Sequence, residues 1–406
     1  MEFIVHNIKM RVEEREEQLA PKVAKKLGIA PEDIAGLRVV RQSLDARKKS
    51  DILFQYTVVA RVDATLGIAK AKKRGAQCYS EWKEQPLTPG SRDLKGRVVV
   101  VGLGPCGLFC GYLLALYGYR PLLIERGQDM EGRMNAFETL QSTGVLDPES
   151  NVCFGLGGAG AFSDGKLTTR IKDPRVNTVL GLLHEFGGPE EILTMAKPHM
   201  GTENIRKAVH NMAQKLQEMG AEIRYNTKLT DLCVADGQLT GAVLSSPDGQ
   251  ERVDTNALVL AVGHSARDTF AMLHQKGLLM ERKPFAIGLR IEHEREFIDR
   301  SQLGEFAGHP RLGAAEYHLS AQQGDRGVYT FCMCPGGEVV CSATEPGHLA
   351  VNGMSYYRRD AQNSNSAVVV SVGTEDMPAH PLGGIALQQQ YEKLCFALSG
   401  SMAAPA

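Results

Sequence analysis

The sequence predicts an α/β protein, and three observations support this prediction. A run of valines at residues 98–101 precedes a glycine-rich turn, as in a parallel strand that is buried on both faces. A helical segment and a second short apolar strand then lead to Glu125. From Phe285 to about Val372 the chain is rich in short alternating or β-branched segments, which indicates a mostly β region.

These patterns divide the chain into five segments, whose boundaries follow changes in composition and turn content. Two prolines and two glycines in "EQPLTPGSRDLKG" mark the clearest linker. The segments are a small basic α/β module (1–84), a linker (85–96), a nucleotide-binding α/β domain with a β-meander (97–284), a mostly β substrate or cap domain (285–380) and an irregular or truncated C-terminal end (381–406).

The first module reads as strand, helix, strand, strand. "EFIVHNIKM" suits a strand, and "EEREEQLAPKVAKKLGI" suits a helix with acids first and lysines last, interrupted by Pro21. "LRVVRQSL" and "DILFQYTVVARV" suit two further strands. This order predicts part of a ferredoxin-like unit.

Composition limits the class of protein. The 406 residues are 43% hydrophobic and 23% charged with a net charge of −1, as in ordinary globular proteins. No apolar run of about 18 residues predicts a membrane span, and no signal peptide is visible. The nine cysteines lack the dense spacing of a secreted disulfide scaffold. We therefore expect a cytoplasmic protein.

Charge is unevenly distributed along the chain. Residues 1–96 contain 19 Lys and Arg but 13 Asp and Glu. A basic module of this kind could contact RNA or another protein. A solvated surface explains the same surplus, so both interpretations stay open.

The turn after residue 101 has the spacing of a dinucleotide cradle. Gly102 allows the tight turn, Gly104 lets the backbone approach a pyrophosphate, and Gly107 lets the helix pack on the strand. Pro105 and Cys106 open that helix, whose first amides attract phosphates. The pattern predicts a Rossmann-type domain.

Glu125 ends the second strand 23 positions after the first glycine. This is close to the spacing of about 20 expected for an acid that binds the ribose hydroxyls. Arg126 follows directly, so binding of a 2′-phosphate is not strictly excluded.

Two later segments favour FAD over NAD. In "FGLGGAGAFSDGKL" several glycines allow the backbone to lie against a flat ligand. In "ALVLAVGHSARD" an apolar strand ends at Gly263, where its backbone would reach the nucleotide. About 130 residues separate this strand from the cradle, which a simple NAD domain does not need.

With these residues the chain resembles the bacterial FAD-dependent dehydrogenases of the two-dinucleotide-binding-domain flavoprotein superfamily. The resemblance covers nearly the whole chain and includes "SLDARKK", "FGLGGAGAFSDGKL", "KPHMGTENI", "KPFAIGLRIEH", "FCMCPGGEVV" and "NGMSYYRRDAQNSNSAVVV". It implies non-covalent FAD and hydride or electron transfer through the flavin ring. The implied cofactor residues are Gly102, Gly104, Pro105, Cys106, Gly107, Glu125, Arg126, Gly157, Gly158, Gly160, Ser163 and Gly263.

The resemblance also implies a further glycine-acid segment and helix near the C-terminus, directed at the flavin. Nothing after Val372 matches that segment. We therefore expect a chain that is truncated relative to this superfamily, and the alternatives are a fragment, a frameshifted product and a variant with weakened FAD binding.

Catalytic residues are not defined by any complete constellation. The candidates are His199, His264, Arg290, Cys332 and Cys334. The two cysteines would face the same side of a strand and could relay electrons, but burial as small apolar side chains is the simpler interpretation. No metal-ligand spacing is visible.

The predicted function is that of an FAD-dependent oxidoreductase, a dehydrogenase whose substrate the sequence does not define. NAD(P)H could serve as reductant, and the partners would be a small-molecule substrate or a redox protein. The alternatives are an RNA-associated flavoprotein of the tRNA-modifying type and a non-catalytic remnant that holds FAD weakly.

Overall fold

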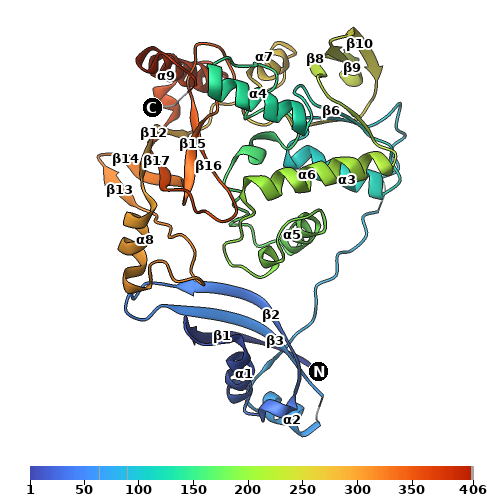
Figure 1. Ribbon diagram of the computed structural model, residues 1–406. Coiled ribbons are helices and arrows are strands. Elements are labelled where there is room, and N and C mark those ends of the chain that lie inside the picture. The colour runs from blue at the N-terminus through green and yellow to red at the C-terminus, as the bar shows by residue number, and fades with distance from the viewer. Residues whose placement is uncertain (64, 89, 404–406) are drawn as a thin grey trace. The chain divides into compact units, whose positions relative to one another are not determined.

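The computed structural model describes residues 1–63, 65–88 and 90–403 (Figure 1). The chain divides into two compact units. The first contains residues 1–89, 166–200 and 294–316, and the second contains the remaining residues. The mixed α/β fold predicted from the sequence is confirmed.

The N-terminal module of the first unit is one four-stranded sheet with two helices. Its elements are β1 (Glu2–Arg11), α1 (Leu19–Leu27), β2 (Ile34–Asp45), β3 (Leu53–Val62), α2 (Thr65–Lys73) and β4 (Gln77–Cys78). The strand order is β2-β3-β1-β4. The predicted order strand-helix-strand-strand is present, and a further helix and strand complete the order of a ferredoxin-like unit. Pro21 lies in the first turn of α1 and does not interrupt it.

Two later helices also belong to this first unit, α5 (Arg175–Glu185) and α8 (Arg295–Leu303). The segment before α6 joins the edge of the N-terminal sheet, because the amide of Gln42 donates to the carbonyl of Thr194 at 2.7 Å. The amide of Ala196 donates back to the carbonyl of Gln42 at 2.8 Å. Sequence reasoning assigned these later segments to the nucleotide-binding and substrate domains.

The second unit is built on a parallel sheet with the order β11-β5-β6-β7. Its strands and main helices are β5 (Val99–Val101), α3 (Pro105–Leu116), β6 (Leu122–Ile124), α4 (Met130–Thr143), α6 (Gly201–Glu218), β7 (Glu222–Arg224), β11 (Leu258–Leu260) and α7 (Arg267–Gln275). The three valines of β5 are buried, as their β-branched run predicted. Strand, glycine turn, helix and strand follow one another in the predicted order.

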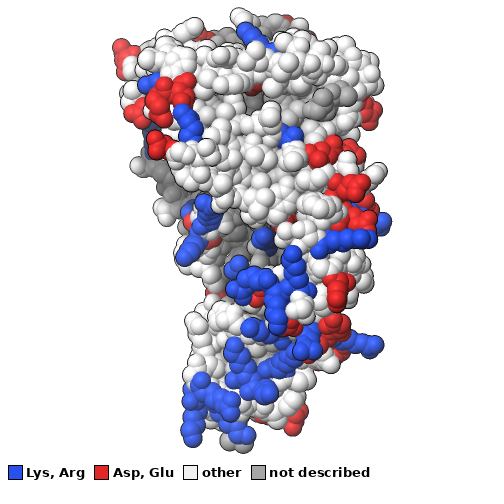
Figure 2. Space-filling model, turned by 90° about the vertical axis from the view of Figure 1, so that its left-hand side faces the viewer, with Lys and Arg blue, Asp and Glu red and all other residues white. Residues whose placement is uncertain are grey.

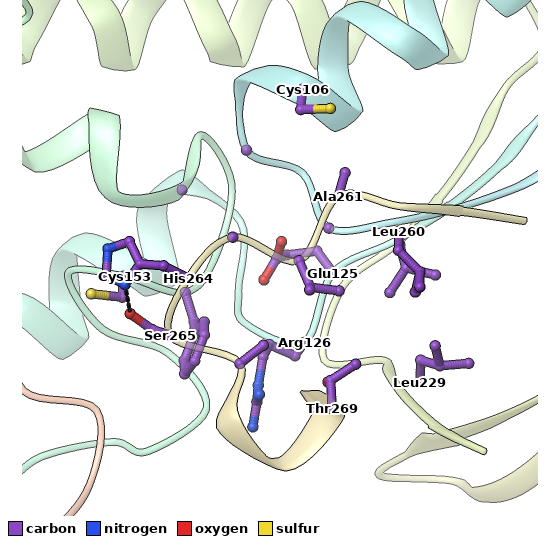
Figure 3. A pocket seen from close by; sticks show the side chains of 18 of the residues that line it. Cys106, Glu125, Arg126, Cys153, Leu229, Leu260, Ala261, His264, Ser265 and Thr269 are labelled. Atoms are coloured by element: carbon purple, nitrogen blue, oxygen red, sulfur yellow. Dashed lines mark hydrogen bonds between the residues drawn. The ribbon is translucent and has the colours of Figure 1, made fainter. Parts of the chain in front are cut away.

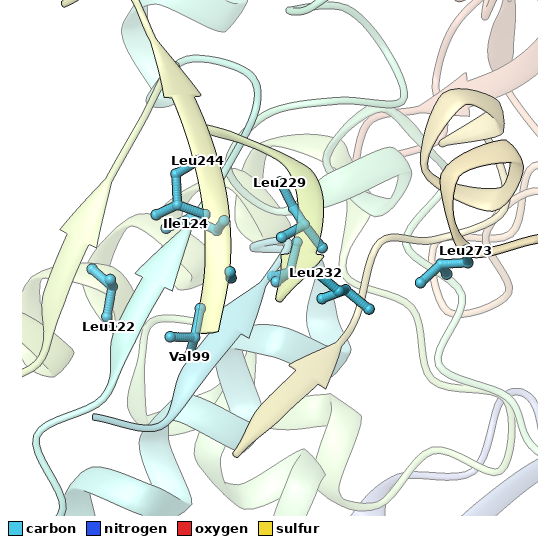
Figure 4. Close-up of a cluster of buried hydrophobic side chains, with 9 residues drawn as sticks. Val99, Leu122, Ile124, Leu229, Leu232, Leu244 and Leu273 are labelled. Carbon is cyan, nitrogen blue, oxygen red and sulfur yellow. The ribbon is translucent and has the colours of Figure 1, made fainter. Parts of the chain in front are cut away.

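An antiparallel meander packs against one face of this sheet (Figure 4). It consists of β8 (Lys228–Ala235), β9 (Gln238–Ser246) and β10 (Gly249–Asp254), joined at the two predicted Asp-Gly turns. Leu229, Leu232 and Leu244 meet Val99 and Ile124 in one buried cluster. Burial of each large side chain stabilises the fold by about 1.5–3 kcal/mol.

Helix α3 lies against the opposite face of the parallel sheet. A Cβ on Gly111 would lie 2.5 Å from a methyl carbon of Leu123, and one on Gly107 would lie 3.5 Å from Val100. The close approach of α3 therefore depends on glycine where the helix meets the strands.

The rest of the second unit is mostly β, as predicted. It contains β12 (Phe285–Glu294), β13 (Ser320–Gln323), β14 (Arg326–Cys334), β15 (Gly337–Cys341), β16 (Val351–Ser355) and β17 (Asn363–Val372). One sheet has the order β12-β17-β14-β13, and β15 pairs with β16. No helix in the described part of the chain combines the length and apolar character of a membrane span.

The prediction of an irregular segment 381–406 is wrong. Residues Gly383–Ser399 form the helix α9, which ends at Gly400 with φ of 68°. The segment is rich in Ala, Leu, Gln, Lys and Glu, which are good helix formers. Arg267 anchors the helix by donating hydrogen bonds to Glu392 at 2.6 and 2.9 Å.

Candidate cofactor site

The turn between β5 and α3 is fixed by close backbone contacts. Gly102 has φ of 100°, and a Cβ there would lie 2.5 Å from the carbonyl oxygen of Ala261. A Cβ on Gly107 would lie only 1.8 Å from the carbonyl oxygen of Gly102. At Gly104 the surroundings are open, since the nearest atom to a Cβ would be the Cα of Gly158 at 3.9 Å. The first and third glycines thus serve the turn itself, and the second leaves space beside it.

That space belongs to a cavity of about 540 Å³ (Figure 3). Five segments of the second unit line it: the turn after β5, the end of β6, the loop around Gly158, the start of β8 and the segment from Leu260 to Leu273. The predicted residues that line it are Gly102, Gly104, Pro105, Cys106, Glu125, Arg126, Gly158, Gly160, Gly263 and His264. At Gly263 nothing described lies within 4 Å of where a Cβ would point.

The chemistry of the cavity changes from one side to the other. Leu229 and Leu260 line one side, and His264 and Ser265 line another (Figure 3). Between them lie the glycine turn and the start of α3, whose first amides have no acceptor within the helix. These amides and the helix dipole favour an anionic group beside the turn.

Glu125 is buried, with 5% of its surface exposed, and its carboxylate holds three backbone amides. One oxygen accepts from Leu103 at 2.8 Å, and the other accepts from Gly127 at 3.0 Å and Gly155 at 2.9 Å. The acid therefore joins the turn after β5, the end of β6 and the glycine loop.

Arg133 of α4 is fully buried and supplies the opposite charge to the same glycine loop. Its guanidinium donates to the carbonyl oxygens of Asn151 (2.9 Å), Val152 (2.7 Å), Leu156 (2.6 Å) and Gly158 (2.8 Å). Burial lowers the pKa of Arg133 to about 10, and the nearby Glu125 opposes this shift. The side chain stays charged at neutral pH and fixes the path of the loop.

The loop itself needs glycine. Gly155 and Gly157 have φ of 112° and 87°, which side chains with a Cβ rarely adopt. The amide of Gly157 donates to the carbonyl of Leu103 at 2.8 Å. The two glycine-rich segments that the sequence singled out are thus in direct contact.

An ion-pair network lies at the rim of the cavity. Arg126 donates to Glu149 at 2.7 Å and to Asp268 at 2.8 Å, and its guanidinium lies 4.2 Å from the centre of the Phe154 ring. Lys228 lies 2.7 Å from Glu149 and 3.3 Å from Asp268. Arg126 is therefore already engaged by two carboxylates.

Burial acts to raise the pKa of both carboxyl groups. Hydrogen bonds from Arg126 and the positive charges of Arg126 and Lys228 together outweigh burial and hold the pKa of Glu149 and of Asp268 below their usual values. Because folding lowers these pKa values, the two ionised carboxylates stabilise the fold at pH values above their usual pKa. This stabilisation is lost as the pH falls through the lowered pKa.

Replacing Arg126 by methionine should therefore destabilise the protein most at neutral pH. We expect a loss of at most about 1 kcal/mol from the ion pairs, because both carboxylates are nearly half exposed and solvent screens them. Urea unfolding of the wild type and the variant from pH 7 down to about pH 3 measures this. The difference should shrink over that interval, and a difference that stays constant with pH would contradict the account.

His264 and Ser265 form a small polar group at the cavity. The Ser265 hydroxyl lies 2.9 Å from Nδ1 of His264 (Figure 3). Cys153 also lines this side, and burial raises the pKa of its thiol. The raised pKa disfavours the reactive thiolate.

The remaining candidates lie elsewhere. His199 pairs with Lys166 in an isolated bridge of the first unit. Three further predicted residues lie close in sequence to lining residues: Gly107, Gly157 and Ser163. The Ser163 hydroxyl donates to the carbonyl of Gly160 at 2.8 Å. None of these four residues is part of the described lining.

Arg290 and the two cysteines belong to the β region. Arg290 donates to Oδ1 of Asn365 at 2.5 Å and to the carbonyl of Cys332 at 3.2 Å. We expected Cys332 and Cys334 to face the same side of a regular strand. The strand is irregular here, because the register shifts between Phe331 and Cys334 and Cys332 has φ of 47°.

Sequence reasoning missed Arg133, Glu149, Lys228 and Asp268. A signal for Arg133 exists in the sequence of α4. Arg133, Phe137 and Leu140 are buried at spacings of four and three residues, so the arginine occupies an apolar position of the helix stripe. Among the described residues, no cluster of His, Cys, Asp and Glu could hold a metal ion.

Comparison with known proteins adds two kinds of result. Residues 284–406 match the family described as "FAD-dependent protein, C-terminal domain-like", and residues 4–61 match a domain of unknown function (DUF8436). An uncharacterized protein of Clostridium beijerinckii is 43% identical over 404 residues, which cover 98% of this chain and 75% of that protein.

Similarity to solved structures is weaker. The chain is 15% identical to the anhydrotetracycline hydroxylase OxyS of Streptomyces rimosus, with a TM-score of 0.31 over 76% of this chain and 49% of that one. It is 12% identical to the flavin-dependent halogenase CmlS, with a TM-score of 0.37 over 75% of this chain and 45% of that one. This chain spans less than half the length of each.

Proposed function

We propose a function from the premise that this chain belongs to one family with its 43%-identical Clostridium beijerinckii relative and contains the C-terminal domain of FAD-dependent proteins. FAD is the cofactor. The protein is an FAD-dependent oxidoreductase that removes hydride or electrons from a bound organic reductant or a nicotinamide. The observation that carries this proposal is the cavity where the glycine turn, the first turn of α3 and Glu125 meet.

The described residues fit FAD in shape and in chemistry. The amides at the start of α3 would hold the diphosphate, and the open side of Gly104 leaves room for it. Leu229 and Leu260 would take the adenine. A carboxylate has about four acceptor sites, and Glu125 uses three of them for backbone amides. One site is left for a ribose hydroxyl, which agrees with the role expected from its spacing.

The ion-pair network at the rim of the cavity favours FAD or NAD over a cofactor with a 2′-phosphate. Arg126, the residue that would pair with such a phosphate, already donates to Glu149 and Asp268. We assign the parallel sheet and its crossover helix to a Rossmann-type domain of the two-dinucleotide-binding-domain superfamily.

Bound FAD supplies the acceptor for hydride or single electrons. The chain's own residues bind the diphosphate, hold the two glycine loops together and limit the access of water to the apolar side. His264 and Ser265 are the polar side chains placed to exchange a proton at the cavity, with Nδ1 of His264 and the Ser265 hydroxyl as the atoms concerned.

The visible spectrum of the purified protein tests this function. We expect flavin absorption bands, after addition of FAD if necessary, and bleaching on anaerobic addition of NADH or dithionite. A protein that stays colourless and does not take up added FAD would contradict the proposal and favour the non-catalytic remnant. Uptake of FAD without bleaching by any reductant would contradict the oxidoreductase but retain the cofactor.

A further inference from the structure

One face of the N-terminal sheet is lined by basic side chains. The strand registers place Lys9 and Arg11 of β1 opposite Gln55 and Leu53 of β3. On the other side of β3, Arg38 and Arg41 of β2 are opposite Val59 and Thr57. Side chains alternate between faces along a strand, so these residues share one face with Arg61 of β3. We call these five residues, Lys9, Arg11, Arg38, Arg41 and Arg61, the basic face.

The opposite face of the same sheet is the apolar core of the module. Phe3, Val5, Phe54, Tyr56 and Val58 are buried there. Helix α1 covers this side with Leu19, Val23, Ala24 and Leu27. A Cβ on Gly67 of α2 would lie 3.0 Å from the buried Val62. Both helices therefore pack on one face of the sheet, and they leave the basic face on the other side uncovered.

All five side chains of the basic face are exposed. The side chains of Arg38 and Arg61 retain 54% and 56% of their accessible surface. The same face also presents Glu2 and Asp45, and Asp45 is paired with Arg47 at 2.6 Å. Arg38 lies 4.0 Å from Glu81 and Arg61 lies 3.7 Å from Asp63, and these exposed ion pairs are weak. Figure 2 shows Lys and Arg side chains gathered over this module, in the lower part of the view.

The chemistry of this face matches a chain of phosphates. Four of its five basic residues are arginines, whose planar guanidinium binds phosphate through two parallel hydrogen bonds. Its apolar members do not protrude, since Val59 is 2% exposed and Ile4 is half-buried. A membrane-binding surface would need apolar side chains to insert, so the face favours a nucleic acid over a bilayer.

The shape of the face favours a single strand. A four-stranded sheet is a known platform for single-stranded RNA, which lies across the strands. Tyr79 follows β4 at one edge of the sheet, and its ring centre lies 5.6 Å from the guanidinium of Arg38 at the other edge. The aromatic ring therefore lies across the sheet, where a base can stack on it.

We propose that the basic face of the N-terminal module binds single-stranded RNA through its phosphate backbone. With one aromatic side chain and five basic ones, binding should depend strongly on salt and little on base sequence. This interaction is separate from the cofactor cavity, which belongs to the other unit.

The test is fluorescence anisotropy of the full chain with a labelled single-stranded RNA of about 20 nucleotides. Each phosphate contact on a single strand contributes about −0.7 to the slope of log affinity against log salt. We expect a slope of about −3 for the wild type. The double variant Arg38→Gln/Arg41→Gln should bind roughly 10- to 30-fold more weakly, with a slope that is shallower by about 1.

The matched control removes the same charge from the helical side. Lys70 and Lys72 of α2 are exposed, and Lys70→Gln/Lys72→Gln should change RNA affinity by less than about twofold. Circular dichroism of both variants verifies folding.

Three results would overturn the proposal. They are no RNA binding by the wild type, an equal loss of affinity in both double variants, and equal competition by polyglutamate at the same charge. The last result would indicate an acidic protein partner. Binding to anionic vesicles but not to RNA would also overturn it.

Discussion

Replacing Arg133 by methionine should lower the free energy of unfolding by at least about 4 kcal/mol, or prevent folding altogether. Methionine fills similar space but donates no hydrogen bond. The carbonyl oxygens of Asn151, Val152, Leu156 and Gly158 would lose their buried donor together. Each buried carbonyl that loses its partner costs about 1–3 kcal/mol, reduced where water can enter.

Arg206→Met is the matched control. Arg206 packs on the Phe162 ring at 4.3 Å, as Arg133 does at 4.8 Å. Among the described residues it donates to one backbone carbonyl, that of Ala161. We expect a loss of about 1–2 kcal/mol. Urea unfolding measures both variants. Equal losses in the two variants, or a loss below about 1 kcal/mol for Arg133→Met, would show that the loop does not depend on the buried guanidinium.

Replacing Glu125 by alanine should have a second large effect, on stability and on FAD binding at once. The amides of Leu103, Gly127 and Gly155 lose their shared acceptor, and we expect a loss of about 3 kcal/mol. Glu125→Gln keeps one oxygen and should lose about half as much. FAD affinity should fall in both variants, because the turn and the glycine loop are no longer held together.

Glu222→Ala is the control for removal of a carboxylate. Glu222 pairs with Arg97 and Arg224 and is 40% exposed, so its loss should cost less than about 1 kcal/mol. FAD titration and urea unfolding measure the set. If Glu125→Ala bound FAD as tightly as Glu222→Ala does, the position of Glu125 at the cofactor would be wrong.

The cradle could be predicted from the sequence because it is a local pattern. Strand, turn, helix and acid lie within 28 residues, and the spacing from Gly102 to Glu125 follows from the regular geometry of that unit. The meander could be predicted for the same reason, since each Asp-Gly turn joins neighbouring strands. Helix α9 could also have been predicted, because its segment is rich in helix-forming residues.

Long-range partners could not be predicted in this way. The burial of Arg133 has a signal in the stripe of α4, but its partners have none, because they are backbone carbonyls, which every residue possesses. Arg126 pairs with Asp268, 142 positions away, and only the folded chain brings them together. The division into units escaped prediction as well, because residues 166–200 and 294–316 join the N-terminal module through tertiary contacts.

The central claim is that the open side of Gly104 receives the cofactor diphosphate, and FAD titration of Gly104→Ala tests it most directly. Gly104 has φ of −70°, which alanine also adopts, and its Cβ would meet only the Cα of Gly158 at 3.9 Å. The free energy of unfolding should therefore change by less than about 1 kcal/mol.

The matched control is Gly181→Ala, in α5, where nothing described lies within 4 Å of the added Cβ. The account predicts that Gly104→Ala weakens FAD binding at least about tenfold, or 1.4 kcal/mol, while Gly181→Ala leaves it unchanged. Equal FAD affinity in the two folded variants would contradict it.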